Sequence, residues 1–187
     1  MTPPTLNMWV NWYSNQWNQY IQYSSYALNH PLVQSLEDPI VVFRQPTDKS
    51  YARYRELIQL IDVAVLDAST LQYHPRAIVA SALYVLLAFH FGQATKEEIA
   101  TLFCKGSQFL NALHPFNDLF GYFLETDFGL SLQELLPTIQ YISTFMSLPF
   151  NFQVPGNEMG AEYHFEDFVS LQTYHPLQME YIKARME

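Results

Sequence analysis

The chain has 187 residues with 9 basic and 18 acidic side chains, so its formal net charge is −9. Hydrophobic residues make up 49% of the sequence and aromatic residues 16%, which is too apolar a composition for a disordered chain. The charge balance argues against a nucleic-acid module and a polybasic membrane-surface protein, because both need clustered Lys and Arg. No apolar stretch reaches the ~20 residues of a bilayer span, no secretory signal is recognisable, and Cys104 is the single cysteine. We therefore expect a soluble intracellular protein.

The segment 6–23 has apolar residues at helical spacing. The apolar positions fall within one ~80° arc at 100° per residue and are Leu6, Trp9, Tyr13, Trp17 and Tyr20. Polar residues occupy the opposite side: Asn11, Ser14, Asn15, Asn18, Gln19 and Gln22. The pattern predicts an amphipathic helix with an aromatic buried face, beginning near Pro3 and Pro4.

The next predicted elements are a connection, a second helix and a central helix. Three X-Pro pairs in 29–50 predict a connection with one short extended piece at 40–43. A helical period then runs to Leu66, with Asp48 or Ser50 as candidate cap. The segment 75–91 is apolar almost all round, so it belongs in the middle of a domain, surrounded by other helices.

The second half of the chain gives weaker signals. Thr95 and Glu98 form a capping-box pattern, but glycines and His-Pro punctuate much of the segment 92–130. Another helix is predicted from Ser131 to the residues before Pro149. Together these features predict one all-α domain over 1–187, an orthogonal bundle of about five helices around the central helix 75–91. The segment 92–130 would be an insertion, and a tail at 156–187 would pack on the bundle.

The usual catalytic motifs are absent from the sequence. There is no GxxxxGK[ST], GxGxxG, HExxH or GxSxG pattern, and no two of the six histidines share a helix at ligand spacing. Cys104 has no recognisable partner base and is interpreted as a buried thiol. We therefore expect no metal, no cofactor, no small-molecule substrate and no enzymatic activity.

Two acidic residues on the second helix need separate treatment, because paired carboxylates can act as acid and base. Asp62 and Asp67 lie five positions apart, which is ~140° around a helix, so they do not face each other. They are interpreted as an exposed charge and a helix-end aspartate. The aromatic stripe on the first helix could stack nucleotide bases, but without basic neighbours core packing is the preferred interpretation.

Three segments resemble the second, C-terminal cyclin fold of the cyclin E family. The segment 57–87, LIQLIDVAVLDASTLQYHPRAIVASALYVLL, is similar to the family's second and third helices. Its matching residues are Leu60, Asp62, Leu66, Asp67, Leu71, Tyr73, Ala80, Ser81, Ala82, Leu83 and Tyr84. The first helix matches at Trp9, Asn11 and Tyr13. Near the end of the chain, Leu171, Gln172 and Thr173 resemble the family's I-Q-T-H tail, with Tyr174 in place of the histidine.

The resemblance implies a five-helix fold whose third helix is enclosed by the others. The first cyclin fold, which grips the kinase, has no counterpart in this chain, so the sequence represents a piece of a longer cyclin or a standalone relative. Arg76 to Val79 echo a docking motif of that first fold, but they fall in the wrong fold and are treated as coincidence. Candidate protein contacts implied by the resemblance are Trp9, Asn11, Tyr13, Leu171, Gln172 and Thr173.

The expected function is that of a non-catalytic regulatory domain, part of a cyclin-dependent protein kinase complex in G1/S-type cell-cycle control. Expected locations are the nucleus and cytoplasm, with the centrosome suggested by the resemblance at Trp9, Asn11 and Tyr13. The alternative is a cyclin-fold adaptor or scaffold that binds another protein without activating a kinase. Partner anchors in that case would be the phenylalanines of 92–130, predicted to be exposed: Phe109, Phe116, Phe120 and Phe123. The alternative is that these phenylalanines cover a core.

Overall fold

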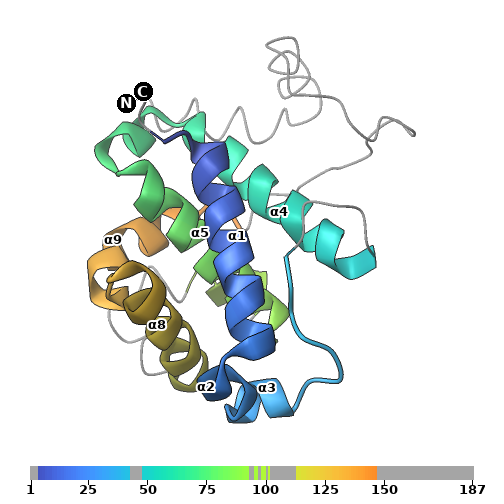
Figure 1. Ribbon diagram of the computed structural model, residues 1–187. Coiled ribbons are helices and arrows are strands. Elements are labelled where there is room, and N and C mark those ends of the chain that lie inside the picture. The colour runs from blue at the N-terminus through green and yellow to red at the C-terminus, as the bar shows by residue number, and fades with distance from the viewer. Residues whose placement is uncertain are drawn as a thin grey trace.

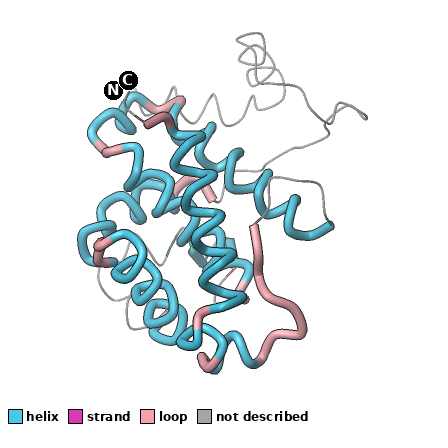
Figure 2. The backbone as a smooth tube through the Cα atoms, in the orientation of Figure 1, coloured by secondary structure: helices cyan, strands magenta, loops and turns pink. Residues whose placement is uncertain are grey.

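The computed structural model describes residues 4–42, 48–92, 95, 96, 98, 99, 101 and 113–146. Within these ranges all regular secondary structure is helical, with seven α-helices and one 3-10 helix and no strand (Figure 2). The predicted all-α class is therefore confirmed. Five helices have 12 to 18 residues, although they are not all those predicted from the sequence. They are α1 (Leu6–Tyr23), α4 (Asp48–Val65), α5 (Pro75–His90), α8 (His114–Phe128) and α9 (Leu132–Ser143).

Helix α1 has the predicted extent, but its polar side is not uniformly exposed. The Thr5 hydroxyl caps it by accepting a hydrogen bond from the Met8 amide at 3.3 Å. Ser14 and Asn18 were predicted on the solvent side and are instead buried. Asn18 is buried because the connection after α3 (Pro31–Gln34) returns across this side of α1.

The returning connection is held to α1 by side chains instead of by a strand partner. Asn18 donates from Nδ2 to the Val42 carbonyl and accepts from the Val42 amide at Oδ1, both at 2.8 Å. Trp17 donates from its indole nitrogen to the Ile40 carbonyl at 2.8 Å. No strand is assigned to 40–42, the described part of the predicted extended piece. These three bonds satisfy backbone groups that would otherwise be buried and unpaired.

Helix α5 is the centre of the bundle. His74 caps it, Pro75 occupies its first turn, and every residue from Ile78 to Ala88 is buried. α1, α4 and α9 pack against it, and α8 reaches it through the ring contacts of Phe116 and Phe120 with Tyr84. The predicted enclosure of this helix is confirmed (Figure 1).

Helix α8 corrects the prediction that glycines and His-Pro break up the segment before residue 130. Pro115 lies in the first turn of the helix, where its missing amide hydrogen costs nothing. The helix ends at Gly129, whose φ of 58° is the left-handed conformation of a C-terminal cap. Ser131 then starts α9, as predicted, and the structure adds a reciprocal capping box to Glu134. Thr95 and Glu98 form the predicted capping box.

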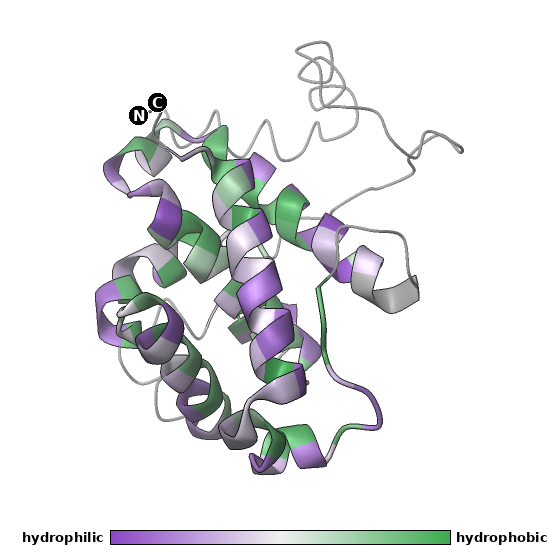
Figure 3. Cartoon of the chain, in the orientation of Figure 1, coloured by the Kyte–Doolittle hydropathy of each residue, from purple (hydrophilic) through white to green (hydrophobic). Residues whose placement is uncertain are grey.

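The buried residues of these helices form one core. Hydrophobic positions face inward, while the side of α1 toward the viewer in Figure 3 is mostly hydrophilic. The predicted tail 156–187 and Cys104 lie outside the described residues, so the single domain over 1–187 stays a prediction.

Replacing Asn18 with Ala should destabilise the protein by about 2–3 kcal/mol, because the buried Val42 amide and carbonyl would lose their partner. Urea unfolding of the variant measures this change. Asn15→Ala is the matched control, since Asn15 is exposed on the same helix. Equal unfolding free energies for the two variants would show that the Asn18 bonds do not hold the connection.

Candidate functional site

The predicted contact residues of α1 do not form one accessible face. Tyr13 is fully buried, with its ring stacked on Phe128 at a centroid distance of 3.9 Å. Its prediction as a protein contact is therefore wrong, because α8 covers this side of α1. Trp9 is half-buried against Trp12 at 5.2 Å, while half-buried Asn11 faces α4, where its Oδ1 accepts a long 3.5 Å bond from the Tyr54 hydroxyl. Leu171, Gln172 and Thr173 lie outside the described residues and stay predictions.

The phenylalanines proposed as anchors of an adaptor do not form an exposed surface where the structure describes them. Phe116, Phe120 and Phe123 are fully buried, so their exposure was wrongly predicted. They lie on the face of α8 that packs into the core, where Trp17 of α1 contacts Phe120 and Phe123. Phe109 lies outside the described residues.

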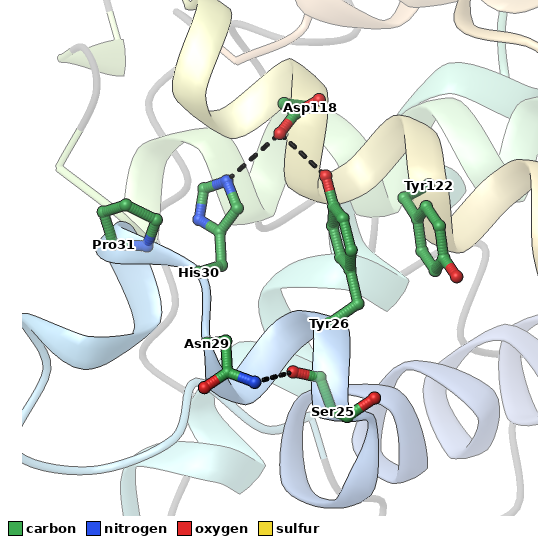
Figure 4. A pocket seen from close by; sticks show the side chains of 7 residues that line it. All are labelled: Ser25, Tyr26, Asn29, His30, Pro31, Asp118 and Tyr122. Atoms are coloured by element: carbon green, nitrogen blue, oxygen red, sulfur yellow. Dashed lines mark hydrogen bonds and ion pairs between the residues drawn. The ribbon is translucent and has the colours of Figure 1, made fainter.

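A surface hollow lies between α2 (Ser25–Leu28), the start of α3 and α8, and Figure 4 shows the residues that line it. It is open to solvent and has a volume of about 520 Å³. Six of the residues that line it are Ser25, Tyr26, Asn29, His30, Asp118 and Tyr122. Residues about ninety positions apart in sequence thus meet at one surface.

Asp118 is the centre of the polar contacts in this hollow. Its Oδ2 accepts a hydrogen bond from the Tyr26 hydroxyl at 2.7 Å and lies 3.6 Å from His30 Nε2. The other ring nitrogen of His30, Nδ1, accepts from the Leu32 amide and caps α3. Asp118 therefore joins α8 to α2 and α3, while its side chain remains 55% exposed.

A second, smaller hollow of about 260 Å³ continues between α1 and α8. Tyr122 lines both hollows and is 41% exposed; its ring stacks on Tyr26 at 3.9 Å. We call the two hollows together the α1–α8 groove. The second hollow adds Gln16, Gln19, Tyr20, Ser24, Thr126 and Asp127.

Negative charge is concentrated along this groove. Burial raises the pKa of the Tyr20 hydroxyl, and the neighbouring Tyr26, Tyr122, Asp118 and Asp127 raise it further. The hydrogen bond to Asp118 raises the pKa of Tyr26 to about 12. Partial desolvation raises the pKa of Asp127 above its ordinary value. Among the described residues that line the groove there is no Lys or Arg to offset these carboxylates.

The groove offers hydrogen-bonding groups to a partner. Carboxylates and tyrosines can accept and donate hydrogen bonds to a partner. Among the described residues, no group of three or more His, Cys, Asp or Glu is placed to hold a metal ion. In the same part of the chain, no helix is both long enough and apolar enough to cross a bilayer.

This groove could not be predicted without α8. The helical spacing of Phe116, Phe120 and Phe123 was the signal that could have found that helix. His30 precedes Pro31 at the start of α3, but nothing in the sequence pairs it with Asp118.

The two acidic residues of the α4 region are separated, as predicted. Asp67 is buried and caps η1 (Ala68–Gln72) by accepting from the Ser69 amide at 2.9 Å. Asp62 was predicted to be exposed, which is wrong: it is half-buried, and desolvation raises its pKa to about 6.

Comparison of the chain with protein-family models, with curated proteins and with solved structures gives no match. The relation to the cyclin E family therefore stays a prediction from the sequence.

Asp62→Asn should stabilise the protein near pH 8 by about 1–3 kcal/mol. The raised pKa means that the folded state binds a proton more tightly than the unfolded state, so ionised Asp62 destabilises the fold above about pH 6. The gain should vanish as pH falls through about 6 toward 4. Urea unfolding at several pH values tests this. Glu37→Gln, at an exposed carboxylate, is the control, and a pH-independent gain at Asp62 would contradict the explanation.

Proposed function

We propose that this chain is a non-catalytic, cyclin-like regulatory domain that acts by binding proteins, as part of a cyclin-dependent kinase complex in G1/S-type cell-cycle control. The observation that carries the proposal is the enclosure of α5, since the resemblance implies a fold with one helix surrounded by the others. The nuclear and cytoplasmic location, and the centrosome, belong to the same proposal.

The packing of α5 explains why small residues suit the matched positions. Ala80, Ser81 and Ala82 are fully buried, so their small side chains let neighbouring helices approach closely. Leu83 and Tyr84 fill the remaining space, also fully buried. Among the other matched residues, Leu71 is 89% exposed in η1 and does not serve the core. The match on α5 therefore has a packing reason, and the match at Leu71 is available for a surface contact.

A domain of this kind would act by binding the active and inactive states of a kinase with different affinities. A rigid helical body that binds the active arrangement of a kinase better than the inactive one shifts the kinase toward activity. Tyr13 does not take part, because it is buried. Two candidate kinase contacts remain. They are the exposed polar residues of α1, such as Asn15, and the tail with Leu171, Gln172 and Thr173.

The second candidate function is an adaptor that binds a protein without activating a kinase. The α1–α8 groove favours it, because the groove is an open, acidic and tyrosine-lined surface that the core does not use. It replaces the phenylalanines as the candidate anchor.

Kinase association separates the two functions. The purified chain should bind a cyclin-dependent kinase in a biosensor titration, and Asn15→Lys on the exposed side of α1 should weaken binding about threefold to tenfold. Gln72→Lys, the same charge change on exposed η1, should leave binding unchanged. Phosphotransfer by the kinase should not rise, since the activating first fold has no counterpart in this chain.

No association at high micromolar concentration of the folded chain would contradict the cyclin-like function and leave the adaptor. Thermal unfolding of each variant shows whether the fold is kept.

A further inference from the structure

The α1–α8 groove has an acceptor that its own fold does not use. Asp118 Oδ2 is occupied by Tyr26 and His30, but within the described part of the chain no hydrogen bond or ion pair engages Oδ1, and more than half of the side chain is exposed. In Figure 4 the carboxylate faces the His30 ring and the Tyr26 hydroxyl, and the Tyr122 ring lies beside Tyr26. A carboxylate held in place by two neighbours is ready to receive a further donor without rearranging the site.

The surroundings of this acceptor favour a cation. Asp127 adds a second carboxylate at the other end of the groove, and Tyr20, Tyr26 and Tyr122 contribute rings and hydroxyls. A guanidinium or ammonium group gains from carboxylates and from the faces of aromatic rings. His30 is the one basic residue in the lining, and it is already directed at Asp118.

We propose that the α1–α8 groove binds an arginine- or lysine-bearing segment of a partner protein. The inference rests on the proposed function, because it takes the chain to be a protein-binding domain and adds the chemistry of what it binds. Charge complementarity favours this occupant, because a nucleic acid or an acidic peptide would meet two carboxylates and, among the lining residues that the structure describes, no Lys or Arg.

The two carboxylates are separate points of attraction. Asp118 and Asp127 are nine residues apart on α8, which is about 14 Å along the helix axis and ~180° around it. One basic side chain therefore cannot meet both, and a segment with two basic side chains can engage one carboxylate with each.

The test is a fluorescence-anisotropy titration with a labelled peptide that carries two arginines in a glycine–serine background. Titration near pH 8 and about 50 mM salt keeps surface charges weakly screened. We expect saturable binding that weakens with added salt. A peptide with citrulline in place of both arginines, which keeps the shape and removes the charge, should not bind.

Two variants locate the binding on the protein. Gln19→Lys places a like charge inside the groove on an exposed position of α1 and should weaken binding about threefold to tenfold. Gln72→Lys changes net charge equally on η1, at the opposite end of the bundle from α2 (Figure 1), and should leave binding unchanged. Combined Asp118→Asn and Asp127→Asn should abolish binding; an asparagine oxygen can still accept from Tyr26, and thermal unfolding checks the fold.

Equal weakening by Gln19→Lys and Gln72→Lys would overturn the inference, because binding would then follow the net charge of the chain and not the groove. Undiminished binding of the citrulline peptide, or no binding of either peptide, would also overturn it. Kinase association measured on the same preparations separates the two proposals. If the chain binds the kinase but no basic peptide, the proposed function stands and the inference about the groove is wrong.

Discussion

The architecture depends on the complete burial of α5. A helix that is apolar on all sides has no face to give to water, so it is stable only when other helices surround it. α1, α4 and α9 supply most of that enclosure, and α8 closes the remaining side through the rings around Tyr84. Some of the polar groups inside find partners there. The Tyr84 hydroxyl meets Asn117 Oδ1, and Thr70 meets both the Ala64 carbonyl and the Tyr141 hydroxyl.

Aromatic rings do much of the packing between α1 and α8. Trp17 contacts Phe120 and Phe123, and the Tyr20 hydroxyl donates to the Leu119 carbonyl at 2.9 Å. Rings are rigid and large, so they fix the separation of the two helices while leaving polar residues at the edge of the contact. The groove is a consequence: where the rings end, Tyr122, Gln16 and Gln19 line an open surface.

Local patterns predicted the fold better than they predicted the site. The bounds of α1 and the enclosure of α5 follow from periodicity and composition, and the cap of α9 follows from Ser131 and Glu134, because each depends on residues that are neighbours in sequence. α8 was missed because Pro115 and Gly121 were read as breaks, although proline is tolerated in a first turn and a single glycine within a helix. The burial of Ser14 and Asn18 could not be predicted, since it depends on where residues 40–42 return.

The pairing of His30 with Asp118 was beyond sequence reasoning for the same reason: it joins residues that only the folded chain brings together. That pairing also fixes the position of the Asp118 carboxylate in the groove. Asp118 Oδ2 holds α2 and α3 against α8, so the carboxylate cannot turn away from the groove without releasing Tyr26 and His30. A basic partner that engages Oδ1 would therefore reinforce the same joint that positions its own binding site. Binding and local stability at this end of the bundle are coupled through one side chain.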